Sequence, residues 1–296
     1  MTIMSFERFL DEVRGFLEED QIVLDRERLS HFSYDATERQ YMPQIALFPE
    51  STGDVSSIMK CACLHGVPVT PQGGRTGLSG GALPVRGGVA LSLARLNRII
   101  EIDEANMFAV VEPGVISNNL QIELSRRGLF FPPDPSSTVD STLGGNVAEN
   151  AGYTRAVKYG VTRDYVRGLE AVLPSGDVIA LGGKTVKNVA GYDLISLLVG
   201  SEGTLAIITK ITLRLLMRPR VRRTVVAYLN DLPGAADLIV AVFRSGIVPC
   251  AIELMDNIAI NTVADHLGAP LPRDAAALVL IETDGHGKEE VEVEAL

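Results

Sequence analysis

The sequence predicts an α/β domain followed by a smaller α+β domain. Residues 44–70 alternate strand, helix and strand patterns and open directly into a glycine-rich loop, which is typical of the start of an α/β domain. Five arginines lie within residues 214–223, and they indicate a solvated boundary. From Thr224 to Glu282 strand and helix patterns alternate again, which indicates a separate α+β domain.

The composition excludes several classes of protein. The chain has 296 residues, enough for one large domain or two ordinary ones, and a net charge of -10. This acidic balance argues against binding to nucleic acid, since neutralising phosphates requires a basic face. The longest apolar runs fall far short of the ~20 residues that span a bilayer, so we expect no transmembrane segment.

The N-terminal residues 1–43 are expected to form a helical segment. Apolar residues from Phe6 to Leu17 recur at helical spacing, and residues 1–20 carry acids throughout, which excludes a secretory peptide. The three cysteines form no CxxC pair and are interpreted as reduced thiols of a cytoplasmic protein. No two of the four histidines have metal-ligand spacing, so we expect no metal site.

The remaining elements are predicted from periodicity and from breaking residues. Ser51 or Thr52 caps a helix that Gly66 ends. A hairpin is expected around residues 174–177. The other predicted strands are 44–48, 67–70, 89–93, 99–102, 108–111, 225–229, 248–254 and 277–282, and the other predicted helices are 117–127, 235–244 and 258–267.

Three glycine clusters carry the functional signal. They lie in PQGGRTGLSGG (71–81), STLGGNVAENAG (141–152) and VGSEGTLAIIT (199–209). Glycine permits positive φ and close approach of the backbone to a ligand, and consecutive N–H groups can then converge on an anion. For one such loop alone, a simple tight connection is an equally good interpretation.

Familiar glycine motifs do not explain these clusters. A Walker A loop would need a glycine where Val178 stands, and no cluster fits the Rossmann fingerprint. Residues 77–81 match GxSxG, the nucleophile elbow of hydrolases, but Pro84 and the following glycines prevent the helix that this motif must open. The match is interpreted as chance.

The ordered set of segments resembles the FAD-binding domain of the vanillyl-alcohol-oxidase (PCMH-type) flavoproteins. Within that superfamily it most resembles the FAD-linked glycolate oxidase subunit and the D-lactate and D-2-hydroxyglutarate dehydrogenases. The matching segments are 45–81, FFPPDPSS (130–137), 141–152, 156–179 and 187–209. The resemblance implies an α+β protein: residues 44–220 as a PCMH-type FAD-binding domain of two α/β subdomains, and residues 221–296 as the start of a substrate (cap) domain, truncated.

The resemblance also implies cofactor contacts. The first loop would wrap the FAD pyrophosphate, the proline turn would lie beside the flavin, the second cluster would line the ribityl region, and the third would hold the adenosine end. The residues so implied are Pro71, Gly73, Gly74, Arg75, Thr76, Gly77, Gly80, Gly81, Pro133, Asp134, Pro135, Ser141, Thr142, Gly144, Gly145, Asn150, Glu202, Gly203 and Ile208. Tyr153 and Ala206 replace glycines of the usual family pattern, and no His or Cys in the first loop offers a covalent flavin link.

The implied reaction is oxidation of a D-2-hydroxy acid of the glycolate or D-lactate class to the 2-oxo acid, with hydride transfer to flavin N5. The implied electron-transfer partner is an iron–sulfur or second flavin subunit, through which the protein could be peripheral to the inner membrane. The cap pattern ends early, so we expect the N-terminal part of a longer enzyme and assign no catalytic residue. The alternative is a non-catalytic FAD-carrying subunit that is active only in a complex; a hydrolase is a distant third.

Overall fold

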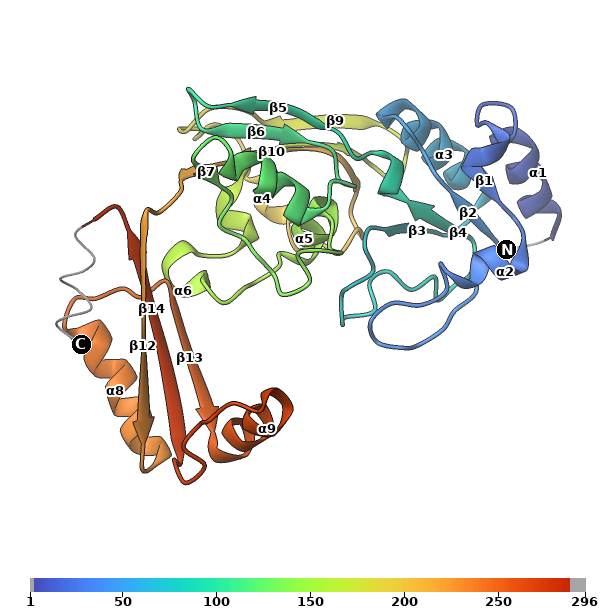
Figure 1. Ribbon diagram of the computed structural model, residues 1–296. Coiled ribbons are helices and arrows are strands. Elements are labelled where there is room, and N and C mark those ends of the chain that lie inside the picture. The colour runs from blue at the N-terminus through green and yellow to red at the C-terminus, as the bar shows by residue number, and fades with distance from the viewer. Residues whose placement is uncertain (1–2, 288–296) are drawn as a thin grey trace. The chain divides into compact units, whose positions relative to one another are not determined.

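The computed structural model describes residues 3–287 and divides the chain into two compact units (Figure 1). Unit 1 comprises Met1–Phe131, Pro135–Ala151 and Thr162–Leu216. Unit 2 comprises Pro132–Asp134, Gly152–Val161 and Met217–Leu296. Each unit is therefore built from three separate stretches of chain.

A four-stranded sheet forms the N-terminal half of unit 1. Its order is β1 (Ile22–Val23), β2 (Ile45–Leu47), β4 (Val89–Ser92) and β3 (Val69–Gln72), and β3 and β2 are both parallel to β4. The helices of this half are α1 (Ile3–Val13), α2 (Arg26–Ser30) and α3 (Thr52–His65). α1 packs against α3, and its Phe9 and Val13 join β2 and β4 in one buried core.

The ends of α3 follow the expected capping chemistry. The Ser51 hydroxyl accepts from the Asp54 N–H while the Asp54 carboxylate accepts from the Ser51 N–H, which is a capping box. Gly66 ends the helix with a φ of 63°. The predicted cap and stop of this helix are confirmed.

A five-stranded antiparallel sheet forms the second half of unit 1. Its order is β5 (Ile99–Asp103), β6 (Phe108–Val111), β10 (Ile207–Arg214), β8 (Val166–Val172) and β9 (Val178–Gly182). The β8–β9 hairpin is the one predicted around residues 174–177, whereas the central strand β10 was not predicted. Other elements are α4 (Ser117–Ser125), β7 (Leu129–Phe130), α5 (Leu143–Glu149), α7 (Leu194–Leu198) and β11 (Leu216–Met217).

Unit 2 is a three-stranded antiparallel sheet with helices against it. The strand order is β12 (Val221–Leu229), β14 (Ala277–Gly285) and β13 (Ala251–Asp256). Ala235 and Val242 of α8 (Leu232–Arg244) cover Val279 and its neighbours on one face. Ile260 of α9 (Asn257–Leu267) packs on Leu278 of the other face, and the short α6 (Ala156–Tyr159) lies against β13. The predicted α+β pattern of this region is confirmed, with longer strands at β12 and β14.

Candidate functional site: a glycine-lined pocket in unit 1

The three glycine clusters meet at one pocket of unit 1, with a cavity volume of about 220 Å³. Fifteen of the nineteen sequence-predicted cofactor residues line it: Pro71, Gly73, Gly74, Arg75, Thr76, Gly77, Gly81, Pro135, Ser141, Thr142, Gly144, Gly145, Glu202, Gly203 and Ile208.

Four predicted residues do not line this pocket. Gly80 lies in the same loop with a φ of 85°, where it permits the turn. Asn150 ends α5 in the left-handed region, and its side-chain oxygen accepts from the Arg163 N–H. Pro133 and Asp134 fall in unit 2.

The loop that follows β3 presents a row of backbone donors to the pocket. The N–H groups of residues 73–77 donate to no protein acceptor within the described chain. Arg75 has a φ of 57°, so the row curves. Backbone N–H groups are obligatory donors that need a partner when water is excluded, and a curved row of them is suited to an anion.

Two glycines allow this loop to pack directly on the segment before α5. A Cβ on Gly74 would lie 2.3 Å from the carbonyl oxygen of Asp140, and a Cβ on Gly73 would lie 2.3 Å from Thr142 Oγ1. Both distances are far inside van der Waals contact. The sequence needs glycine at these two positions because the loop backbone meets the Asp140 backbone at Gly74 and the Thr142 side chain at Gly73.

The N-terminus of α5 is satisfied within the protein and is not a second row of free donors. The Gly144 N–H donates to the Pro113 carbonyl at 2.8 Å, and the Gly145 N–H donates to Thr142 Oγ1 at 3.3 Å. Ser141 and Thr142 are buried. These residues form the wall of the pocket, and the backbone donors of Ser141, Gly144 and Gly145 are already used.

Gln72, at the end of β3, is a pocket residue that the glycine pattern did not single out. It is 1% exposed, and its Nε2 donates to the Phe32 carbonyl at 2.9 Å and the Ala82 carbonyl at 2.7 Å. Its Oε1 is buried without a partner among the described residues. This acceptor on the pocket wall suits a ligand that carries hydroxyl or N–H donors.

Three carboxylates also line the pocket, and two of them, Glu149 and Asp35, were not predicted. Burial raises the pKa of Glu149, the neighbouring Glu202 and Asp35 charges raise it further, and the hydrogen bond from Ser79 opposes them. The Ser79 hydroxyl donates to both Glu149 oxygens, at 3.0 and 3.1 Å. Ser79 therefore bonds to a carboxylate and not to a histidine, the usual base of a hydrolase triad.

Arg75 is the basic residue of the loop. Its guanidinium carbon lies 5.2 Å from the centre of the Phe32 ring, which is a cation–π contact. Burial lowers its pKa, although a guanidinium stays charged at physiological pH. The contact fixes the side chain beside the loop and leaves the loop's N–H row accessible.

A second polar cluster lies in unit 2 and was not predicted. Asp284 on β14 is 2% exposed, and it accepts from Lys158 Nζ at 2.8 Å and from the Tyr159 hydroxyl at 2.9 Å. Asp284 lies more than 120 residues from Lys158 and Tyr159 in the sequence, so no local motif could reveal the cluster. The two donors fix α6 to the central strand of unit 2.

Comparison with protein families gives two matches along the chain. A model described as "FAD binding domain" matches residues 43–182, and one described as "FAD linked oxidases, C-terminal domain" matches residues 218–296. Among the described residues, no helix is long and apolar enough to cross a membrane.

Curated relatives of this chain are named as oxidases or dehydrogenases of 2-hydroxy acids. The glycolate oxidase subunit GlcD of Bacillus subtilis (strain 168) is 44% identical over 86% of this chain and 54% of that protein. The D-lactate dehydrogenase of Anaerostipes hadrus is 37% identical over 84% and 54%, and the D-2-hydroxyglutarate dehydrogenase of Stutzerimonas stutzeri (strain A1501) is 32% identical over 98% and 63%. The chain thus spans little more than half the length of these relatives.

Solved structures agree on the fold. An alkyldihydroxyacetonephosphate synthase matches with a TM-score of 0.83 at 22% identity, covering 98% of this chain and 58% of that one. A p-cresol methylhydroxylase with bound substrate matches with a TM-score of 0.83 at 19% identity, covering 100% and 64%. The predicted PCMH-type fold is confirmed by these neighbours.

The pocket fits the cofactor that the family name specifies. Free backbone donors suit a pyrophosphate, and the partnerless Gln72 oxygen and the carboxylates suit hydroxyl and N–H donors, all of which FAD carries. The predicted cofactor, FAD, is supported by both family matches. Residues 43–182 thus match a FAD-binding domain, and residues 218–296 match the C-terminal domain of FAD-linked oxidases.

Proposed function

We propose that the protein oxidises a D-2-hydroxy acid of the glycolate or D-lactate class to the 2-oxo acid. The observation that carries the proposal is the row of unpartnered N–H groups at residues 73–77, in the pocket where the three glycine clusters meet. The curated relatives named above supply the substrate class. Bound FAD would supply a flavin able to accept hydride at N5.

The chain's own residues would hold the cofactor chiefly through the backbone. The N–H row at residues 73–77 would bind the pyrophosphate, and Gln72 Oε1 and Glu202 would accept from hydroxyl or N–H groups. Pro135, Ser141, Thr142, Gly144, Gly145, Gly203 and Ile208 would form the walls. Roles for Gly80, Pro133, Asp134 and Asn150 beside the cofactor stay proposals that rest on the resemblance alone.

We expect FAD to be held without a covalent bond, since the loop at residues 71–81 contains no His or Cys. Acid precipitation of the yellow protein should release all the flavin into the supernatant. Flavin retained in the pellet would contradict non-covalent binding, and a colourless protein that ignores added FAD would contradict the whole proposal.

The reaction is tested by anaerobic mixing of the flavin-loaded protein with glycolate, D-lactate and D-2-hydroxyglutarate, with L-lactate as the control. Bleaching of the flavin by a D-2-hydroxy acid or glycolate, without bleaching by L-lactate, is the expected result. A loaded protein that stays yellow with all of them supports the second candidate, a non-catalytic FAD-carrying subunit. The name "subunit" of the Bacillus subtilis relative supports that candidate and a partner subunit. That this partner carries an iron–sulfur cluster or a second flavin rests on the resemblance alone.

The cellular location stays a proposal as well. Cys61, Cys63 and Cys250 are free thiols, which is typical of a reducing compartment. We therefore propose a cytoplasmic protein that would reach the inner membrane only through its electron-transfer partner. Fractionation of cells that express the chain with and without that partner tests this.

A further inference from the structure

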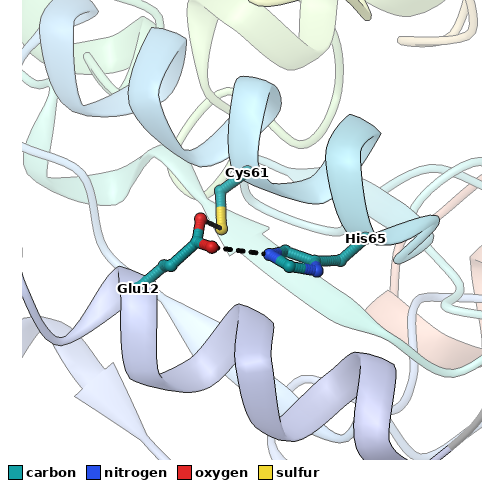
Figure 2. Close-up of side chains that lie close together, drawn as sticks. All are labelled: Glu12, Cys61 and His65. Atoms are coloured by element: carbon teal, nitrogen blue, oxygen red, sulfur yellow. Dashed lines mark hydrogen bonds and ion pairs between the residues drawn. The ribbon is translucent and has the colours of Figure 1, made fainter.

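A cluster of three metal-ligand side chains joins α1 to α3, away from the cofactor pocket. Figure 2 shows Glu12 of α1 facing Cys61 and His65 of α3. None of the three lines the pocket. Histidine spacing along the sequence predicted no metal site, whereas this cluster forms only when two helices pack together.

The ligand atoms are already close together. Glu12 Oε1 lies 2.9 Å from His65 Nε2, and Glu12 Oε2 lies 3.4 Å from Cys61 Sγ. All three ligand atoms lie within 4.8 Å of one another. Tetrahedral zinc with ordinary bond lengths of about 2.0–2.3 Å places neighbouring ligand atoms about 3.3–3.6 Å apart, so only small side-chain adjustments are needed.

The scaffold holds these side chains in place. Cys61 and His65 are four residues apart on α3, so they share one face of the helix. Phe9 and Val13 flank Glu12 on α1 and are fully buried against the same helix. The Ser5 hydroxyl also donates to the His65 carbonyl. Both helices are therefore fixed by contacts that do not involve the three ligands.

The degree of exposure suits an ion that enters from solvent. The Glu12 side chain is 50% exposed and that of His65 is 12% exposed, while Cys61 is buried. The carboxylate thus lies at the solvent side and the thiol at the inner side. A fourth position remains for water.

We infer that Glu12, Cys61 and His65 bind one zinc-class divalent cation, with water as the fourth ligand. A thiolate, an imidazole and a carboxylate form a donor set that selects zinc over magnesium or calcium, which prefer oxygen ligands alone. On binding, the Cys61 S–H bond breaks, a sulfur–metal bond forms and the proton goes to solvent. No electron is transferred.

The competing interpretation is a hydrogen-bonded triad that only ties the two helices together. Without an ion, the thiol is a neutral donor to Glu12, and burial with that hydrogen bond raises the pKa of Cys61 to about 12. The two interpretations differ in whether sulfur ever coordinates a metal. The decisive measurement must therefore report on the sulfur.

Cobalt(II) is the probe, added to the reduced, chelator-treated chain in which Cys63→Ser and Cys250→Ser remove the other thiols. We expect a thiolate-to-cobalt charge-transfer band that saturates at one ion per chain and disappears when zinc is added. Cys61→Ser should abolish the band. Glu12→Gln and His65→Gln should weaken binding by about tenfold or more, the effect seen when even an outer-shell partner is lost.

Glu7→Gln is the matched control, because Glu7 is an exposed acid on α1 outside the cluster. It should leave the band and the affinity unchanged. Absence of a charge-transfer band in the parent at saturating cobalt, or an equal band in Cys61→Ser, overturns the inference.

A second measurement needs no cysteine substitution. Zinc should raise the melting temperature of the unmodified chain, a chelator should reverse the rise, and Glu12→Gln should abolish it. A melting temperature that zinc does not change, or a zinc-induced rise of equal size in Glu12→Gln, also contradicts the inference. Neither experiment depends on FAD or on activity.

Discussion

The cofactor pocket of unit 1 and the polar cluster of unit 2 are built by opposite means. The pocket is lined by glycines that let loops touch, and the N–H groups of its residues 73–77 donate to no acceptor among the described residues. The cluster is made of side chains, with Asp284 held by Lys158 and Tyr159. A backbone site is broken by adding atoms and a side-chain site by removing them, and each can be tested in that way.

The largest expected effect is on the pocket. Gly74→Val would place a branched side chain against the Asp140 carbonyl, where even a Cβ would lie at 2.3 Å. The loop must move, and the N–H row moves with it, so we expect FAD retention to be lost. Equilibrium dialysis of FAD with the refolded variant measures this.

Two controls accompany Gly74→Val. Gly152→Ala adds a Cβ where no atom lies within 4 Å, and it should retain FAD. Ser79→Ala removes one hydroxyl, worth about 0.5–1.5 kcal/mol as a net hydrogen bond, and should retain most of it. Equal FAD affinity in Gly74→Val and Ser79→Ala would show that this loop does not touch the cofactor.

A smaller effect is expected in unit 2. Lys158→Met would leave the buried Asp284 with Tyr159 as its remaining side-chain donor. Breaking a buried ion pair lowers the free energy of unfolding by about 3–5 kcal/mol. We expect the low end of this range, about 3 kcal/mol, because the Lys158 side chain is 29% exposed. Hydrogen exchange of β12, β13 and β14 in urea isolates the free energy of unfolding of unit 2.

The matched control for Lys158→Met is Lys184→Met. Lys184 pairs with Glu101 on the surface, where the two side chains are 38% and 45% exposed. Such pairs contribute about 0–1 kcal/mol, so this variant should unfold like the parent. If both variants lose the same stability, the cluster is an ordinary surface pair.

The smallest effect concerns Glu149. Its pKa in the folded chain is raised, chiefly by burial, so folding disfavours its charged form. The resulting loss of stability is absent at pH values below the unfolded pKa and develops as the pH rises through the folded pKa. Glu149→Gln should therefore raise the melting temperature at neutral pH and leave it unchanged at acid pH. A melting temperature lowered at neutral pH would show that the charge is stabilising.

The same contrast explains what the sequence could and could not reveal. A cluster of glycines in the sequence indicates a place where the backbone makes close contacts. Predictions made from these clusters therefore succeeded for fifteen of the nineteen cofactor residues, which line one pocket. Caps such as Ser51 and Gly66 are also local, and both were predicted. The strand β10 escaped prediction because its start overlaps the third glycine cluster, which was interpreted as loop.

Contacts between residues that are distant in the sequence could not be predicted from local sequence patterns. Glu149 and Asp35 lie beside the predicted loops, yet nothing in their neighbours along the chain indicates that they share a pocket. Glu12 meets Cys61 and His65 across 49 and 53 positions. Periodicity describes one element at a time, so pairings between elements require the fold itself.

The interrupted course of the chain also sets an order of folding. The segment Gly152–Val161 leaves unit 1 between Ala151 and Thr162, and Thr162 closes its base by donating from both its N–H and its hydroxyl to the Ala151 carbonyl. The partner of Lys158 on β14 is synthesised 126 residues later. During synthesis from the N-terminus, Lys158 and Tyr159 have no Asp284 to bind until β14 has been made. We therefore expect the unfinished chain to leave α6 accessible to chaperones and proteases.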